Sequence, residues 1–373
     1  MSPAPLGYDI FCRVIDNYGD IGVCWRLARQ LAGAPFHAPV RLWVDDLTAF
    51  ARIEPGVSPD RNRQPLGGVD IIHWTADAPA LTPHPVVIEA FACDPPDDFV
   101  RRMIAQDSLC INLEYLSAES WVESCHALPS LQSNGLRKSF FFPGFTPATG
   151  GLLREPGLIA ARDAWLANPE TRWNWLRTLG LGSGLIEGLQ SGWRQVFLFG
   201  YPSAPVCALI EALARQPQAT VVLRPRGMYP DLAEPLDAKV RVVEIPFVPQ
   251  AEFDQLLWSS DLNFVRGEDS LVRAIWAGKP LVWQIYEQEE NIHLDKLQAW
   301  LDRSPYSPAV HALMRAWNTA DATATARHLD ELLNPSAWAQ WCVQAGRWSA
   351  ELARQTDLAT ALTAFCANNR RKE

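Results

Sequence analysis

Residues 8–31 read YDIFCRVIDNYGDIGVCWRLARQL, and they contain one complete strand–turn–helix unit of an α/β fold. An apolar run at 10–15 predicts a strand, and apolar residues then recur every three or four positions from Ile21 to Leu31, as on one face of a helix. The turn between them carries Asp16 and Asp20. In an open α/β sheet such a turn lies at the carboxyl end of a strand, where ligands bind. A purely structural alternative is that Asp16 starts the turn and Asp20 caps the helix.

The same alternation of strand and helix patterns continues through both halves of the chain. Near-continuous apolar runs, such as 86–91 and 109–113, predict strands buried on both faces and hence parallel sheets covered by helices. Residues 179–192 read LGLGSGLIEGLQSG, and their glycines predict a linker. A helical pattern at 345–367 closes the chain. The sequence therefore predicts two domains, which a length of 373 residues also favours.

The expected fold class is α/β, with two doubly wound Rossmann-like domains facing a central cleft. A cleft between domains is the default place for a ligand. GT-B glycosyltransferases have this plan, and nucleotide-sugar epimerases share it, so the fold alone does not decide the function.

Charge, cysteine spacing and the lengths of apolar stretches argue against several classes of protein. The formal net charge is −9 and the pI about 5.4, which argues against a general nucleic-acid binder. The eight cysteines form no C-x-x-C pair, so neither a zinc site nor a thioredoxin-type motif is indicated, and a reducing, cytoplasmic setting is expected. We expect neither a signal peptide nor a membrane span, because the sequence shows no apolar stretch of the required kind.

The motifs of several enzyme classes are absent from the sequence. It contains no G-x-G-x-x-G after the first strand, no P-loop, no H-E-x-x-H and no G-x-S-x-G. No two aspartates lie two positions apart, so the D-x-D metal element of GT-A glycosyltransferases is missing. A mechanism without a bound metal is the simpler expectation.

A second polar turn lies in residues 264–275, FVRGEDSLVRAI. A strand ends before Arg266 and Gly267, and Glu268, Asp269 and Ser270 open a helix. A helix N-terminus suits a phosphate because its N–H groups are unpaired and its dipole is positive there. Two acids beside a diphosphate would repel it, so at least one of them must face elsewhere. The structural alternative is ordinary capping, since acids and serine are common in the first turn of a helix.

Three further residues follow predicted strands and fit a ligand cleft. Phe247 could stack on a nucleobase and Gln250 could bind the polar edge of that base. Tyr201 ends the strand pattern QVFLFGY, at a place where residues of a cleft lie. The alternatives are that Phe247 belongs to a core and that Tyr201 only holds a loop.

Taken together, three segments resemble the bacterial protein-arginine rhamnosyltransferases that modify translation elongation factor P. They are DIFCRVIDNYGDIGVCWRLARQL at 9–31, WVDD at 43–46 and LNFVRGEDSLVRAIWAGKPLVWQIY at 262–286. The resemblance extends over essentially the full length of the chain. It implies an inverting GT-B glycosyltransferase that moves L-rhamnose from dTDP-β-L-rhamnose to the guanidino nitrogen of one arginine of elongation factor P, with no cofactor.

The resemblance also implies roles for domains and residues. The acceptor side would be a domain at 1–184, with a C-terminal helix at about 350–373 packing back on it, and the donor would bind a domain at 190–345. By motif position Asp20 would be the catalytic base, with Asp16 and Glu268 as further catalytic carboxylates. The residues implied in donor binding are Asn17, Tyr18, Gly19, Asp20, Tyr201, Phe247, Gln250, Arg266, Gly267, Glu268, Asp269 and Ser270.

The chemistry of the acceptor agrees with this set of residues. An arginine guanidinium has a pKa above about 12 and is a poor nucleophile while it is protonated. Carboxylates in a dry cleft could orient one nitrogen, and one of them could take the proton as the new bond forms. Two other functions remain open on the residues alone. They are a nucleotide-sugar epimerase or hydrolase of the same fold, and a non-catalytic binding partner of the translation factor.

Overall fold

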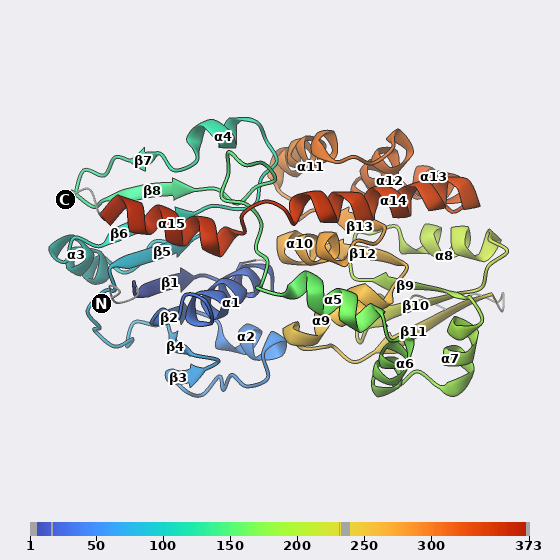
Figure 1. The fold of residues 1–373 in the computed structure, drawn as a ribbon, viewed down its shortest axis with the longest axis horizontal. Coiled ribbons are helices and arrows are strands. Elements are labelled where there is room, and N and C mark those ends of the chain that lie inside the picture. The colour runs from blue at the N-terminus through green and yellow to red at the C-terminus, as the bar shows by residue number, and fades with distance from the viewer. Residues whose placement is uncertain (1–5, 16–17, 231, 233–238, 371–373) are drawn as a thin grey trace. The chain divides into compact units, whose positions relative to one another are not determined.

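The computed structural model describes residues 6–15, 18–230, 232 and 239–370. It divides into two compact units, which we call unit 1 (Met1–Pro156 and Arg354–Glu373) and unit 2 (Gly157–Ala353). Each unit has its own sheet with helices packed on it (Figure 1).

Among the described residues, the sheet of unit 1 has eight strands. They are β1 (Tyr8–Cys12), β2 (Val40–Val44), β3 (Arg63–Leu66), β4 (Val69–His73), β5 (Val86–Ala90), β6 (Leu109–Leu113), β7 (Pro129–Ser130) and β8 (Lys138–Phe141). Their order is β3-β4-β2-β1-β5-β6-β8-β7, with antiparallel pairing only for β3 and β7 at the two edges. The six parallel strands follow the Rossmann order, and the switch point of the sheet lies between β1 and β5.

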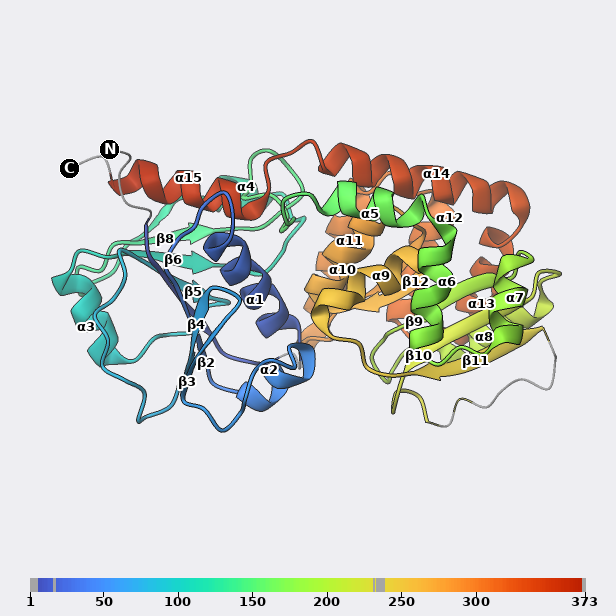
Figure 2. The ribbon, with the colours of Figure 1, turned by 60° about the horizontal axis from the view of Figure 1, so that its bottom comes forward.

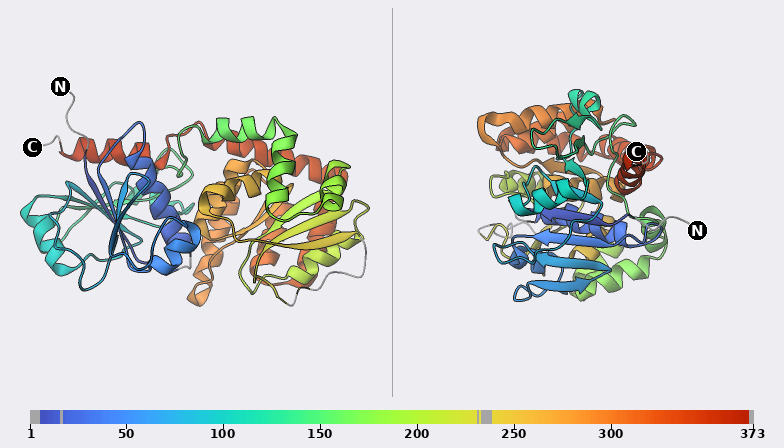
Figure 3. Two further views of the ribbon diagram at one scale, coloured as in Figure 1. Left: turned by 90° about the horizontal axis from the view of Figure 1, so that it is seen from below. Right: turned by 90° about the vertical axis from the view of Figure 1, so that its left-hand side faces the viewer.

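Helices cover both faces of this sheet. They are α1 (Gly19–Ala32), α2 (Leu47–Ile53), α3 (Asp97–Ala105), α4 (Trp121–Cys125) and α15 (Leu358–Arg370). Ile10 of β1 belongs to a core cluster with Trp25 of α1 and Leu362 of α15. Phe11 belongs to a second cluster with Phe99 of α3. Because successive side chains of a strand point to opposite faces, α1 and α15 cover one face and α3 the other, as Figures 2 and 3 show.

In the part of unit 2 that the structure describes, the plan is repeated with five parallel strands. They are β9 (Arg194–Leu198), β10 (Thr220–Pro225), β11 (Val240–Ile245), β12 (Leu262–Arg266) and β13 (Leu281–Gln284). Their order is β11-β10-β9-β12-β13, so the switch point lies between β9 and β12. The helical elements are α5 (Leu158–Leu166), α6 (Pro169–Thr178), α7 (Ser183–Gln190), α8 (Val206–Arg215), α9 (Gln250–Ser259), α10 (Gly267–Ala277), η1 (Glu289–Asn291), α11 (Ile292–Arg303), α12 (Pro308–Asn318), α13 (Ala322–Leu332) and α14 (Pro335–Leu352).

Aromatic contacts show that this sheet is also covered on both faces. The ring of Phe197 in β9 meets Phe253 of α9, with 5.7 Å between centroids. The ring of Phe264 in β12 meets Trp317 of α12 at 4.5 Å. Phe197 is in register with Asn263, the residue before Phe264, so the two rings point to opposite faces. Helices on both faces of a parallel sheet make unit 2 doubly wound, as the sequence predicted.

The predicted linker at 179–192 is wrong. Ser183–Gln190 form α7, and the chain leaves unit 1 at Pro156, well before the predicted boundary between 184 and 190. Ile186 and Leu189 are buried, so packing of an apolar face overrides the weak helix propensity of glycine. A Cβ atom at Gly188 would lie 2.6 Å from the ring of Trp193. Glycine therefore allows close packing at this position and does not mark a linker.

The closing helical pattern at 345–367 forms two helices. The first, α14, ends at Leu352 inside unit 2, and α15 starts at Leu358 in unit 1. Asp357 caps α15 by accepting the backbone N–H of Thr360 at 3.1 Å. The same Oδ1 atom accepts a bond of 2.8 Å from the side-chain amide of Gln30 in α1. The crossing between the units thus starts at 353–354, and the expected boundaries at 345 and 350 lie inside one continuous helix.

Candidate active site

The loop after β1 is held by two carboxylates. Oδ2 of Asp20 accepts the backbone N–H of Ile15 at 2.8 Å, and Oδ1 of Asp45 accepts that of Val14 at 2.9 Å. Asp20 is only 2% exposed. Helix α1 starts at Gly19 with Tyr18 as its N-cap, so Asp20 is the second residue of the helix and not its cap. The capping alternative is therefore wrong for Asp20, although its carboxylate does have a structural contact.

The WVDD segment at 43–46 holds the β1–α1 loop and caps the next helix. Asp45 binds the β1–α1 loop, and the next residue, Asp46, caps α2 by accepting the N–H of Ala49 at 2.9 Å. From α2, the guanidinium of Arg52 donates a 3.0 Å bond to the hydroxyl of Tyr18. These contacts fix both ends of the loop at the switch point of unit 1. Asp16 and Asn17, which the sequence analysis also assigned to the site, lie outside the described residues.

Two buried thiols lie near Asp20. Burial raises the pKa of Cys12 well above its usual value, and the side chain of Cys24 and the charge of Asp20 raise it further. Burial likewise raises the pKa of Cys24. Both thiols therefore stay neutral at pH 7 and add no charge or reactive thiolate beside Asp20.

The loop after β12 forms the corresponding site of unit 2. Arg266 ends the strand and is the N-cap residue of α10, and Gly267 follows with φ of +63°. This left-handed conformation favours glycine. The carbonyl of Gly267 accepts the indole N–H of Trp283 at 2.9 Å. Within the described part of the chain, the Arg266 side chain makes no capping bond to α10. The first turn of α10 therefore presents N–H groups at the switch point, an arrangement that suits a phosphate.

Arg266 is positioned by aromatic rings. Its guanidinium carbon lies 4.7 Å from the ring centroid of Phe199 and 4.8 Å from that of Tyr201. Contacts of this kind hold a cation in place with about 0.5–2 kcal/mol. The backbone N–H of Tyr201 donates a 2.7 Å bond to Oε1 of Gln284, so Tyr201 both holds its loop and positions the cation.

Asp269 is turned toward cationic and amide partners. Its Oδ2 accepts Nε of Arg273 at 3.1 Å and the amide of Gln250 at 3.3 Å. Arg273, which is 3% exposed, also pairs with Asp254 at 2.9 Å. Of the two acids in the first turn of α10, Asp269 is thus paired within unit 2, and it shares the charge of Arg273 with Asp254. Glu268 and Ser270 are partly buried in the same turn.

Phe247 is 39% exposed and follows β11. The alternative that Phe247 belongs to a core is therefore wrong. Gln250, at the start of α9, is partly buried, and its side-chain amide donates a hydrogen bond to Asp269 of α10. The exposed ring, the amide and the first turn of α10 all lie after the carboxyl ends of β11 and β12.

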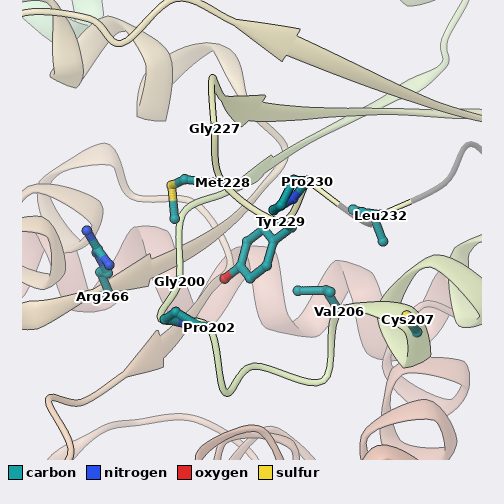
Figure 4. A pocket seen from close by; sticks show the side chains of 10 residues that line it. All are labelled: Gly200, Pro202, Val206, Cys207, Gly227, Met228, Tyr229, Pro230, Leu232 and Arg266. Atoms are coloured by element: carbon teal, nitrogen blue, oxygen red, sulfur yellow. The ribbon is translucent and has the colours of Figure 1, made fainter.

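A pocket of about 420 Å³ opens beside Arg266 (Figure 4). Residues after β9 and β10 line it, among them Pro202, Val206, Met228 and Tyr229. Figure 4 shows the hydroxyl of Tyr229 directed toward Gly200, and it donates a 3.1 Å bond to the carbonyl of Tyr201. Apart from Arg266, the residues that line this pocket were not predicted from the sequence. The signal was present in PRGMYP at 225–230, a turn pattern that directly follows the strand pattern TVVLR at 220–224.

The described residues include no group of three or more histidines, cysteines, aspartates or glutamates that could hold a metal ion. In the same residues, no helix is both long and apolar enough to cross a membrane. The absence of a metal requirement and a cytoplasmic location remain predictions.

The fold and the two loops define a glycosyltransferase of the GT-B class. The spinosyn forosaminyltransferase SpnP matches over 99% of this chain and 100% of its own with a TM-score of 0.52, and at 11% identity this likeness concerns the fold alone. The solved structure on EarP-mediated arginine glycosylation of translation elongation factor EF-P matches with a TM-score of 0.62. It is 34% identical and covers 97% of this chain and 99% of its own. The predicted fold class is therefore confirmed.

The family follows from sequence comparison. The model of the elongation-factor P (EF-P) rhamnosyltransferase EarP matches residues 8–367. The protein-arginine rhamnosyltransferase of Pseudomonas putida is 46% identical over 97% of this chain and 99% of its own. The enzyme of the same name from Neisseria meningitidis is 36% identical over the full length of both chains. The chain belongs to the EarP rhamnosyltransferase family, as its motifs predicted.

Proposed function

We propose that this enzyme transfers L-rhamnose from dTDP-β-L-rhamnose to a guanidino nitrogen of one arginine of elongation factor P, with inversion at the sugar. The observation that carries the proposal is the pair of dissimilar loops at the two switch points. One holds a buried carboxylate, Asp20, and the other a cation, Arg266, at a helix N-terminus. Membership of the EarP family supports the choice of sugar and acceptor.

In this proposal unit 2 binds the donor. The exposed ring of Phe247 stacks on thymine, and Gln250 binds the polar part of the nucleoside. The diphosphate lies at the first turn of α10, which begins at Gly267, because the N-terminus of a helix offers backbone N–H groups to an anion. Arg266, held by its aromatic neighbours, balances the charge that develops on the leaving dTDP. The contacts of Asp269 with Arg273 and Gln250 orient its carboxylate toward partners within unit 2 and weaken its repulsion of the diphosphate.

Unit 1 supplies the base and the acceptor side. A guanidinium nitrogen attacks C1 of rhamnose on the face opposite to dTDP. The C–N bond forms as the bond from C1 to the phosphate oxygen breaks, the electron pair leaves with dTDP, and Asp20 takes the proton from nitrogen. The 2.8 Å bond to Ile15 fixes the orientation of the Asp20 carboxylate before reaction.

The remaining assigned residues complete this proposal. Asp16 and Glu268 serve as further carboxylates that orient the guanidinium and the sugar. Asn17, Tyr18 and Gly19 contact the donor from the β1–α1 loop, and Tyr201 contacts it from unit 2. Phosphate-binding roles for Ser270 and for the backbone of Asp269 follow from their places in the first turn of α10.

The test is intact-mass analysis of elongation factor P after incubation with this enzyme and dTDP-β-L-rhamnose. The expected result is a shift of one deoxyhexose, absent when the acceptor arginine is replaced by lysine. Consumption of the donor without a mass shift would contradict the proposal in favour of an epimerase or hydrolase. An unchanged donor and an unchanged acceptor would also contradict it, in favour of a binding role.

A further inference from the structure

The turn after β5 has an unusual backbone. Phe91 and Ala92 are consecutive non-glycine residues in the left-handed region, with φ of +58° and +56°. Such residues are uncommon, and they persist where the surrounding structure holds them. Here the N–H of Phe91 donates to the carbonyl of Leu113 at 2.7 Å, and the thiol of Cys93 donates to the carbonyl of Phe11 at 3.1 Å. The turn is thus bonded to both neighbouring strands, β6 and β1.

This backbone places the ring of Phe91 on Tyr115. The two rings are stacked with 4.4 Å between centroids and 16° between planes. Both side chains are only partly buried. Phe91 follows the carboxyl end of β5 and Tyr115 that of β6, so the stack lies at the edge of the sheet where ligands of this fold bind. Since β5 pairs with β1, Phe91 follows the strand beside the one that leads into the Asp20 loop, and Tyr115 follows the next strand, β6.

A carboxylate lies next to the stack in the chain. Glu114 directly precedes Tyr115, and its Oε1 accepts the side-chain amide of Asn112 at 2.6 Å. The backbone N–H of Glu114 donates to the carbonyl of Phe141 at 3.0 Å, which fixes this position at the end of the sheet. Aromatic faces with an adjacent carboxylate form a binding place for a guanidinium, which stacks as a plane and donates in its own plane.

We propose that the Phe91–Tyr115 stack receives the acceptor arginine and positions it for reaction at the β1–α1 loop, with Glu114 binding the edge of its guanidinium. This inference rests on the proposed function, because it assumes an arginine acceptor. The stack acts by holding the side chain flat, so its residues are positioning residues. A lysine ammonium lacks a planar face and would gain less from the same site.

The experiment is a double-mutant cycle on binding of elongation factor P in the presence of dTDP. Phe91→Leu and Tyr115→Leu in the enzyme are each combined with replacement of the acceptor arginine by alanine. Each enzyme variant is expected to weaken the Kd for the natural acceptor roughly two- to thirty-fold, the range of cation–π contacts. Neither should change the Kd for the alanine acceptor. Tyr115→Phe, which keeps the ring, should restore the affinity.

Two controls separate this contact from a loss of structure. Phe140→Leu removes another partly buried aromatic of the same sheet, stacked on Phe142 with 6.1 Å between centroids, and should leave both Kd values unchanged. The affinity for dTDP should be unchanged in every variant. In steady state, Phe91→Leu should raise KM for the acceptor more than it lowers kcat.

Equal weakening of both acceptors, or no weakening of either, would overturn the inference. The proposed function has its own separate failure, which is the absence of a deoxyhexose shift with the unaltered enzyme. Normal transfer by the unaltered enzyme, with unchanged binding in the Phe91 and Tyr115 variants, would leave that function standing and refute only the role of the stack.

Discussion

The loops that follow β1 and β12 share a local plan and differ in their charged side chains. Each follows a parallel strand at the switch point of its sheet, and each leads into the N-terminus of a helix. After β1, the buried carboxylate of Asp20 accepts the N–H of Ile15. After β12, the guanidinium of Arg266 lies on aromatic rings, and Asp269 is paired with Arg273. The same backbone arrangement therefore carries a buried carboxylate in one unit and a cation at a helix N-terminus in the other. We propose that the first is a proton acceptor and the second an anion site.

The sharpest way to break this comparison is Asp20→Asn. The asparagine oxygen can still accept the N–H of Ile15, so the loop should keep its shape while the base is lost. We expect turnover to fall roughly 10²- to 10⁴-fold, with little change in the thermal midpoint. Rates from the mass assay and a melting curve measure the two effects.

Asp45→Asn is the matched control, because Asp45 accepts the N–H of Val14 in the same loop at 2.9 Å and has no proposed part in the chemistry. Its rate should remain much closer to that of the unaltered enzyme. If both substitutions reduced turnover equally, Asp20 would act only by holding the loop.

A second prediction tests the cationic side. Arg266→Gln removes the charge beside the first turn of α10 and should lower kcat/KM for the donor by about 10- to 100-fold, the loss expected for one hydrogen bond to a charged group. Steady-state rates at varied dTDP-β-L-rhamnose give this value. Arg226→Gln is the control, because Arg226 is largely exposed and pairs with Glu244. A similar loss of kcat/KM in both variants would mean that the overall positive charge of unit 2 matters, and not the position of Arg266.

A third prediction concerns the base of the donor. Phe247→Ala should weaken dTDP about five- to one-hundred-fold, the range for loss of one stacking contact, while the stability changes little because the ring is 39% exposed. Calorimetric titration with dTDP measures the affinity. Phe247→Trp should retain most of it. Unchanged affinity in the alanine variant would remove Phe247 from the donor site.

The smallest expected effect is that of metal removal. If Arg266 and the α10 N-terminus together balance the diphosphate charge, dialysis against EDTA should leave the transfer rate unchanged. Loss of activity that returns on addition of Mg²⁺ or Mn²⁺ would contradict the prediction. It would also place part of the electrostatic role outside the β12–α10 loop.

Local patterns predicted much of the fold and the two polar turns of the candidate site. The β1–α1 and β12–α10 units were visible because apolar spacing reports helix and strand faces over a few residues. The five glycines at 179–192 led to the wrong prediction of a linker, because the sequence does not show that Gly188 packs against Trp193. Met228 and Tyr229 were missed because their role as pocket lining depends on α8 and β12, which lie elsewhere in the chain.

The sequence by itself determined the alternation of elements, the polar turns after the first strand of unit 1 and the fourth strand of unit 2, and the family. These properties depend on neighbours within a few residues and on long motifs. Only the tertiary structure decided that Asp20 turns back to its own loop, that Asp269 faces Arg273 and Gln250, and that Phe91 stacks on Tyr115. The physical reason is that a side chain's orientation depends on strand order, register and packing against distant segments, and these determine which of several similar polar groups faces the ligand.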